Sequence, residues 1–470
     1  MRLSVVSLSL CFLCQSAFAN DAAFDRKTLD KAATLRDGAL QKNEAYALLE
    51  SLTTEVGPRM AGSPADAKAV AWAEQKFKAL GYDKVYLQAV TYPVWQRVNE
   101  QAEVLSPFPQ KLHITALGGS VGTDGKTLDA EVVEFESLDA LKAAPENSLN
   151  GKIAFINKRM ERHKDGSGYG PVVAGRGAGA VEAAKKGAVA VIIRSVGTDD
   201  NRLPHTGMMR YSDDVKKIPA AALSVPDADL VEHMLKRGKP LTLRLDITAG
   251  LTGTYTSYNV IGEIRGREKP DEVVVIGGHL DSWDLGTGAV DDGAGVSITM
   301  AAGAVIGQMK QAPRRTIRVI AFANEEQGLY GGKAYADTNK ANVDNHQIGA
   351  ESDFGAGRIY SFGAGVNDNV WPVIEQIGSV LAPLGIVTER GKGSAGPDVG
   401  PISALGMPWA ELQQDGTDYF DLHHTANDTF DKVDPKALDQ QVAAYAAFAY
   451  LSAESKMDFG TTPKKVEEKK

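Results

Sequence analysis

Segment 271–309 joins an apolar run, a glycine-rich stretch and a second apolar run. "DEVVVI" (271–276) has the composition of a buried strand, and "VSITMAAGAVIGQM" (296–309) that of a helix rich in small apolar residues. Between them, "GGHLDSWDLGTGAVDDGAG" (277–295) carries one histidine and four aspartates among glycines. A core strand that leads through a polar loop into a buried helix predicts one βα unit of a largely parallel sheet.

The alternation of strands and helices continues further along the chain. "TIRVIAFA" (316–323) and "RIYSFGA" (358–364) have the composition of further buried strands. Strands that alternate with helices indicate a sheet covered by helices, and such sheets place their sites at the carboxyl ends of the strands. We therefore predict an α/β fold with a doubly wound, mostly parallel sheet.

Residues 105–252 differ in sequence pattern from the segments on either side, which predicts an inserted domain. "LNGKIAFINK" (149–158) and "GAVAVIIRS" (187–195) indicate strands, with a loop and a short helix between them at 169–187, and residues 218–235 add a strand and a helix. Ionisable side chains cluster little in this insert. We therefore expect it to shape substrate access rather than to carry the chemistry.

Two features of the insert invite a functional interpretation. Gly175-Arg-Gly-Ala-Gly179 follows a G-x-G-x-G pattern, but it lacks the spacing and the acidic partner of a dinucleotide site. His205 stands alone in "LPHTGMMRY" (203–211). We expect His205 on the rim of the cleft or, with greater weight, on the outer surface.

The N-terminus predicts a secretory signal peptide. Arg2 precedes an apolar core, and Ala17-Phe-Ala19 forms a small-residue cleavage site. The apolar run is shorter than the roughly 20 residues that a membrane span needs. Both cysteines of the chain, Cys11 and Cys14, lie in this segment. After cleavage the protein would have no thiol, which excludes a cysteine nucleophile and a cysteine zinc site.

Charge and composition limit the partners and complete the domain division. Loss of Arg2 takes the formal net charge from −9 to −10, and no basic cluster lies outside the tail. This balance argues against nucleic acid or an anionic membrane as the main partner. We predict a periplasmic or secreted protein divided into a signal peptide (1–19), a catalytic domain in two parts (20–104 and 253–457), the insert (105–252) and a disordered tail (458–470).

Histidines and carboxylates gather where predicted strands end. His279 and Asp281 follow the strand 272–278, and Glu325 with Glu326 follow the strand 316–323. Two adjacent carboxylates repel each other and raise each other's pKa unless a cation lies between them. The same loops also hold Asp291, Asp292, Asp353, His423, His424 and Asp428.

Each of these features alone has an ordinary explanation. An H-x-D pair is commonly a polar contact, and aspartates that open a helix are favoured by its dipole. Together, two loops with histidine and three with carboxylate at the ends of parallel strands indicate a hydrolase with two metal ions. Mixed histidine and carboxylate ligands without thiolate suit zinc in a catalytic site.

The motifs "GGHLDS", "GAVDDGAG", "NEEQGL", "ESDFG" and "HHTANDT" resemble the two-zinc exopeptidases related to bacterial leucyl aminopeptidases and glutamate carboxypeptidase. "GPRMAGS" (57–63) and "LQQDGTDYFDLHHTANDT" (412–429) resemble the carboxypeptidase Q branch in particular. Residues 105–252 resemble the protease-associated domain inserted in many of these enzymes. The resemblance spans nearly the whole mature chain.

The resemblance implies a role for each residue of the motifs. His279 and Asp353 would bind one zinc ion, Glu326 and His424 the other, and Asp291 would bridge the two. Loss of Asp291 should then affect both metals, and loss of Asp292 should be far milder. The resemblance further makes Glu325 the general base, Asp281 the partner that orients His279, and His423, which replaces a tyrosine of the relatives, a candidate to stabilise the oxyanion.

Three functions follow from these motifs. The first is a secreted zinc exopeptidase that cleaves dipeptides or short peptides with a free terminus. The second is a glutaminyl cyclase-like acyl transferase on the same fold. The third is a binding protein without catalysis, which the complete ligand set disfavours. The predicted partner is a small peptide, and a homodimer is one candidate assembly. Side-chain preference, dipeptidase or aminopeptidase action, oligomeric state and propeptide removal stay open.

Overall fold

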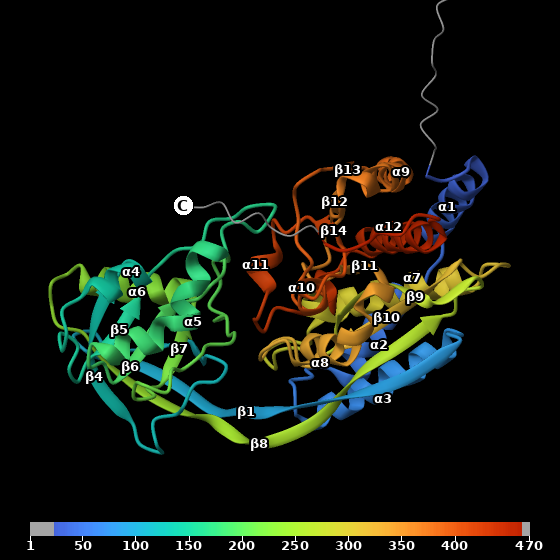
Figure 1. Cartoon of the computed structure of the whole chain (residues 1–470). Helices are drawn as coiled ribbons and strands as arrows, with labels where there is room; N and C mark the ends of the chain where they lie inside the picture. The colour runs from blue at the N-terminus through green and yellow to red at the C-terminus, as the bar shows by residue number, and fades with distance from the viewer. Residues whose placement is uncertain (1–22, 463–470) are drawn as a thin grey trace, which may run out of the picture.

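Two long antiparallel strands, β1 (Lys84–Ser106) and β8 (Thr242–Ile264), run from one lobe of the molecule to the other (Figure 1). They pair from Lys84 with Glu263 to Ser106 with Thr242. The computed structural model describes residues 23–462, so the predicted signal peptide and the end of the predicted tail lie outside the described residues. Below, β1 and β8 together are called the ribbon.

The larger lobe contains the centre of the sheet. Its strand order from the outer edge to the ribbon is β13-β12-β14-β11-β9-β10-β8. The pairs β10–β9, β9–β11, β11–β14 and β12–β13 are parallel, whereas β12 is antiparallel to β14 and β8 is antiparallel to β10. The predicted parallel arrangement is therefore found in the middle of the sheet. The strand bounds are β9 Lys269–His279, β10 Arg315–Phe322, β11 His346–Glu351, β12 Ile359–Gly365, β13 Val387–Thr388 and β14 Trp409–Gln414.

Helices cover both faces of this sheet because its strands are apolar on both sides. In β9, Val274 and Ile276 join one core cluster with residues of α7 and α12, while Val273 and Val275 join another with residues of α8 and α10. Buried strands of this kind are typical of parallel sheets. The helices of this lobe are α1 Arg26–Ala39, α2 Ala45–Ser51, α3 Pro64–Ala79, α7 Ala294–Gly307, α8 Tyr330–Asn339, α9 Trp371–Leu381, α10 Gly400–Ala404, α11 Tyr419–Leu422 and α12 Pro435–Glu454.

Helix α7 is the central helix of this core. The stretch Ala289–Gly307 is long and apolar enough to cross a membrane, but 94% of its most apolar window is buried inside the protein. It therefore serves as a core helix.

Near the end of the described residues, residues 458–462 pack against the larger lobe, although the sequence assigns them to a disordered tail. Phe459 is fully buried, and its N–H donates to the side-chain oxygen of Gln347.

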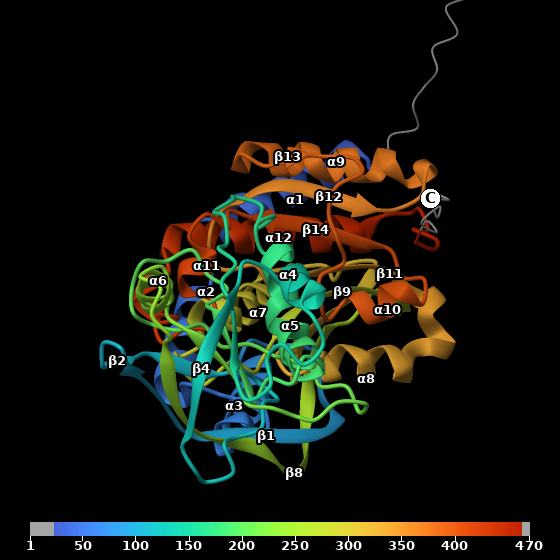
Figure 2. The same cartoon turned by 90° about the vertical axis from the view of Figure 1, so that its left-hand side faces the viewer.

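The smaller lobe, called the accessory lobe below, is formed by the inserted segment and the adjoining ends of the ribbon (Figures 1 and 2). Strand β4 pairs with the beginning of β8, and β5, β6, β7 and β3 follow in the same sheet. The boundaries predicted at 104/105 and 252/253 both fall inside strands of the ribbon. The bounds are β2 Gln110–Leu112, β3 Ile114–Ala116, β4 Leu128–Phe135, α4 Leu138–Ala143, β5 Ile153–Ile156, α5 Gly170–Lys185, β6 Ala190–Arg194, β7 Ala220–Leu223 and α6 Val225–Leu235.

Gly175, Gly177 and Gly179 of segment 169–187 lie inside a helix rather than in a loop. Helix α5 has 16 residues and packs against β5. A Cβ atom at Gly179 would lie 2.8 Å from the side chain of Ile156. Gly179 thus lets the helix approach the sheet closely, and the predicted loop with a short helix is wrong.

Candidate active site

The fold gathers the predicted site residues at one edge of the central sheet. His279 is the last residue of β9, Glu325 and Glu326 follow β10, and Asp353 follows β11. His423 and His424 follow α11, directly after β14. Because the carboxyl ends of parallel strands meet at the same edge, loops distant in sequence converge here.

The carboxylate of Asp291 lies between two histidines. Its Oδ1 atom is 3.1 Å from Nε2 of His279, and its Oδ2 atom is 3.2 Å from Nε2 of His424. Nε2 of His279 also lies 3.4 Å from Asp353 Oδ1, and Nε2 of His424 lies 3.0 Å from Glu326 Oε2. The residues thus form two groups, each with one histidine and one further carboxylate, that share Asp291.

Backbone carbonyls orient both histidines. Nδ1 of His279 is 3.0 Å from the carbonyl oxygen of Asp281, and Nδ1 of His424 is 3.2 Å from that of Thr206. A carbonyl only accepts, so each Nδ1 carries a proton, and Nε2 faces the carboxylates. The carboxylate of Asp281 is 3.6 Å from His279 Nδ1, and its Oδ1 accepts the N–H of Glu325 at 3.0 Å instead. The carbonyl of Asp281 thus lies closer to His279 Nδ1 than the carboxylate that the sequence predicts as its partner.

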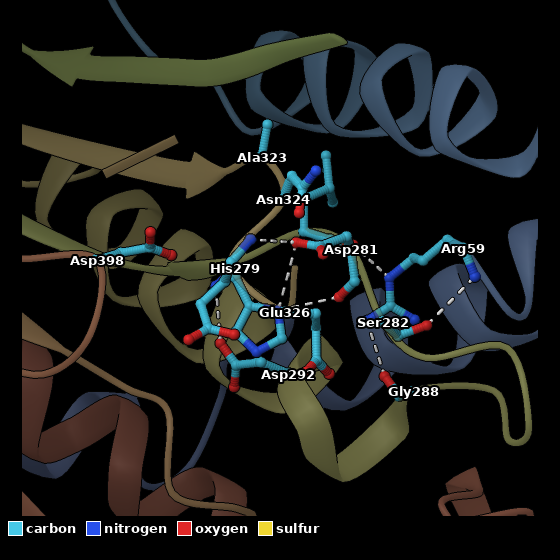
Figure 3. Close-up of polar contacts among 12 residues, drawn as sticks. Arg59, His279, Asp281, Ser282, Gly288, Asp292, Ala323, Asn324, Glu326 and Asp398 are labelled. Atoms are coloured by element: carbon cyan, nitrogen blue, oxygen red, sulfur yellow. Dashed lines mark hydrogen bonds and ion pairs between the residues drawn. The ribbon is translucent and has the colours of Figure 1, made fainter. Parts of the chain in front are cut away.

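Asp292 is a scaffold for this centre. The Asp292 carboxylate accepts the N–H of His279 at 2.9 Å and that of Gly295 at 3.0 Å, and the residue is fully buried (Figure 3). Asp291 and Asp292 have φ angles near −128° and −127° with non-helical ψ, and α7 begins only at Ala294. The two aspartates therefore precede the helix instead of opening it, and Asp292 caps its first turn.

Two further residues hold the loop between β9 and α7. Arg59 is fully buried and donates to the carbonyls of Leu280, Thr287 and Gly288 at 2.5, 2.7 and 2.8 Å. Figure 3 shows Arg59 beside Gly288. The carboxylate of Asp428 accepts the N–H groups of Val290 and Asp291 at 2.6 and 3.2 Å. Sequence reasoning missed Arg59, whose one signal is its place in the "GPRMAGS" turn.

The accessory lobe contacts the segment that carries His423 and His424. His205 is only 1% exposed; its Nδ1 donates to the carbonyl of His423 at 2.8 Å, and its Nε2 lies 3.2 Å from Asp199 Oδ2. Thr206 N–H donates to the carbonyl of His424 at 3.1 Å. The predicted surface position of His205 is therefore wrong, because this lobe packs over the histidine segment and buries it.

His423 and Glu325 complete the cluster. The His423 ring stacks on that of His424, with centroids 3.5 Å apart, and its Nε2 is 3.7 Å from Asp291 Oδ2. Burial lowers the pKa of His423, which favours the neutral ring. Burial also raises the pKa of Glu325 well above its usual range, helped by the charges of Asp353 and Glu326. A raised pKa suits a carboxylate that exchanges protons at neutral pH.

The residues fit metal ions. Asp291 Oδ2 and Glu326 Oε1 are buried and have no hydrogen-bond partner within residues 23–462. Burial lowers the pKa of His424, but the charges of Glu326 and Asp291 outweigh it and raise that pKa to about 9. The centre therefore attracts positive charge. Groups that can hold a cation are Asp291 with His423 and His424, His279 with Asp292 and Asp353, and His279 with Asp291 and Glu326.

The sequence and the fold both match known peptidases. The model of peptidase family M28 matches residues 259–449. Bovine carboxypeptidase Q is 36% identical over 413 residues, which cover 88% of this chain and 86% of that protein. The chain belongs to peptidase family M28. Membership confirms the predicted family and makes the chain a peptidase, as the sequence predicts.

Solved structures of M28 peptidases share the architecture. The crystal structure of a peptidase M28 precursor from Shewanella amazonensis is 52% identical, with a TM-score of 0.92, and covers 94% of this chain and 100% of that one. A zinc aminopeptidase from Bacillus subtilis, 19% identical, has a TM-score of 0.65 over 90% of this chain and 98% of its own. The second likeness concerns the fold alone. Both support a mixed α/β fold around one large sheet.

Proposed function

We propose that this M28 peptidase is a secreted exopeptidase with two zinc ions that hydrolyses dipeptides or short peptides with a free terminus. The position of Asp291, with one oxygen beside His279 and the other beside His424, carries the proposal. A carboxylate that faces two histidines in opposite groups is suited to bridge two cations. The signal peptide predicted from the sequence supports secretion or a periplasmic location, and the accessory lobe is proposed to be a protease-associated domain.

The proposed ligands follow the two groups. His279 and Asp353 would hold one zinc ion, His424 and Glu326 the other, and Asp291 both. Bound zinc would supply Lewis-acid polarisation of the scissile carbonyl and acidify the attacking water. Asp292, Asp428 and Arg59 are proposed to maintain the loop through backbone contacts, and Asp281 to hold the turn of Glu325.

Glu325 is the proposed general base. It would take the proton of the attacking water and pass it to the leaving amine, because a carboxylate of raised pKa can both accept and return a proton. His423 faces Asp291 and is proposed to donate a hydrogen bond to the developing oxyanion. Its neutral ring carries one N–H group for this role.

A dipeptide library tests the proposal. We expect the purified protein to release free amino acids, detected by mass spectrometry, with about two zinc ions per chain by metal analysis and loss of activity with a chelator. A glutaminyl peptide in the same series tests the alternative function, a glutaminyl cyclase-like acyl transferase. Cyclisation of that peptide without cleavage of any dipeptide would refute the peptidase assignment in favour of acyl transfer.

A further inference from the structure

A pocket opens beside the metal centre, on the side of Asp353. It is lined by the end of β11, the loop 394–397, β14 and one residue of the accessory lobe, and its volume is about 280 Å³. Pockets that enclose a whole drug-sized ligand measure roughly 300–1,000 Å³, so this one has the size of a single side chain. Because Asp353 is a proposed zinc ligand and lines the pocket, a substrate bound at the metals can extend a side chain into it.

The charged groups of the pocket are all carboxylates. Besides Asp353, the lining contains Asp165, Glu351 and Glu411, and no lysine, arginine or histidine of the described residues lines it. Glu351 is 7% exposed. Its Oε2 atom accepts two backbone N–H groups at 2.8 and 3.0 Å, whereas Oε1 has no hydrogen-bond partner within the described part of the chain. A buried oxygen without a donor is costly, so this one indicates a ligand that supplies the donor.

The lysines nearest in sequence are paired outside the pocket. Lys164 precedes Asp165, and its Nζ lies 3.6 Å from the carboxylate of Asp415. Nζ of Lys392 lies 2.9 Å from the carboxylate of Glu389. Neither lysine lines the pocket, so the protein itself leaves the negative charge of the pocket without a cation.

The loop between β13 and α10 is shaped around two of these carboxylates. The N–H of Ser394 donates to Glu411 Oε2 at 2.9 Å. A Cβ atom at Gly393 would lie 2.6 Å from that same oxygen, and one at Gly396 would clash with Glu351 Oε2; both glycines have φ angles in the left-handed region. Burial raises the pKa of Glu411, and the hydrogen bond from the loop only partly opposes this shift. A cation beside this carboxylate would therefore stabilise its charged form.

The pocket also offers apolar contacts. Apolar side chains in its lining are Phe354, Ala395, Pro397 and Ala410. A Cβ atom at Gly166 of the accessory lobe would lie 2.5 Å from the ring of Phe354, so the two lobes are in contact here. Carboxylates together with apolar walls match a side chain that has a methylene stem and a cationic end.

We propose that this pocket binds the side chain of a lysine or arginine residue of the substrate, an inference that rests on the proposed peptidase function. The stem would lie along Phe354 and Pro397, and the cationic end would donate to Glu351 and Glu411. The enzyme would then be selective for basic dipeptides. A neutral side chain of the same length would fill the apolar part and leave the carboxylates without a partner. The α-ammonium group of the peptide has no methylene stem, so it does not match the apolar walls.

Matched dipeptides test the inference. The values of kcat/KM are measured for lysyl-alanine and norleucyl-alanine, and for alanyl-lysine and alanyl-norleucine, because norleucine has the four-carbon chain without the ammonium group. The order in which lysine is preferred identifies the residue that enters the pocket. In that order, Glu411→Gln should lose roughly 10- to 100-fold on the lysine peptide, as expected for hydrogen bonds between charged groups, and less than about 2-fold on the norleucine peptide. Glutamine keeps an oxygen for the N–H of Ser394.

Controls separate side-chain recognition from folding and from the function itself. Glu389→Gln removes the same charge near the loop but outside the pocket, and it should keep the lysine-to-norleucine ratio of wild type. If Glu411→Gln does not fold, Asp165→Asn, a change at an exposed position, must lower that ratio.

Three results would overturn the pocket: no preference for lysine in either order, equal losses on both peptides in Glu411→Gln, or the same loss of preference in Glu389→Gln. Equal losses would be expected if the carboxylates held the α-ammonium group, which every unblocked peptide carries. If wild type cleaves none of the four dipeptides, the proposed function itself has failed.

Discussion

Asp291 and Asp292 are adjacent and chemically identical, but the structure predicts opposite responses to Asp→Asn. At Asp291 the carboxylate faces His279 and His424, and its backbone N–H is held by Asp428. Asparagine fits the same space and removes the charge. We expect Asp291→Asn to fold normally and to lose most of its zinc at both positions, with hydrolysis abolished.

At Asp292 both oxygens are committed to backbone N–H groups at 2.9 and 3.0 Å. Asparagine keeps one acceptor and turns an NH₂ group towards the other donor. Losing a hydrogen bond to a charged group removes about 1.5–3 kcal/mol, and an unsatisfied buried donor costs about 1–3 kcal/mol more. We therefore expect Asp292→Asn to lower the free energy of unfolding by about 2.5–6 kcal/mol. The mild effect predicted from the sequence then applies to metal affinity but not to stability.

The assay combines metal analysis with urea unfolding in excess chelator, because bound metal would otherwise stabilise the folded state by mass action. Asp291→Asn should have a wild-type unfolding midpoint without metal and a low zinc content. Asp292→Asn should have a lower unfolding midpoint than wild type without metal and a zinc content close to that of wild type. Two zinc ions retained in Asp291→Asn, or wild-type stability in Asp292→Asn, would refute the assignment of bridge and scaffold.

Three other predictions follow from the same contacts. Glu325→Gln should keep both zinc ions and lose at least about 10²-fold in turnover, because the general base is removed. Glu326→Gln should instead lose affinity for one zinc ion and regain activity with added zinc. The opposite result for the two variants would exchange their roles. His205→Ala should free the His423 carbonyl and reduce the zinc content towards one per chain, measured by metal analysis, while unchanged zinc and turnover would show that the contact is dispensable. Burial lowers the pKa of His346 to about 4, below its usual value of about 6.5. The protein should therefore lose roughly 3 kcal/mol of its free energy of unfolding as the pH falls from about 6.5 to 4, because the unfolded chain binds the proton first. A His346→Gln variant that keeps the same steep pH dependence of unfolding in urea would contradict this.

The parts of the site that the sequence predicts are those that follow strands directly. His279, Glu326 and Asp353 each come within a few residues of an apolar run, so local pattern alone places them at one sheet edge. The order of parallel strands then brings them together. The same reasoning locates α7, because its apolar residues are uninterrupted.

The parts that the sequence does not predict depend on contacts between distant segments. Arg59 donates to backbone carbonyls, and Thr206 accepts from His424 through its own carbonyl. Every residue has a backbone carbonyl, so such contacts produce no recognisable pattern of residue types in the sequence. His205 stands alone in the chain, and its burial results from the docking of two lobes. In α5, the glycines suggest a loop when only the local sequence is considered. The side chain against which Gly179 packs, Ile156, lies in strand β5, outside that local pattern.

The ribbon has a consequence for the order in which parts of the chain can fold. The accessory lobe comes from a continuous segment, whereas α1 and α2 pack against α7 and α12, which come much later in the chain. Pairing of Ser106 with Thr242 closes the accessory lobe first, and the remaining pairs can then form one after another towards Lys84 and Glu263. Each new pair closes only a small additional loop, so the entropy cost falls mainly on the first contact. A defect that slows this lobe would leave the N-terminal helices without their core and exposed to aggregation, although it changes no residue of the metal centre.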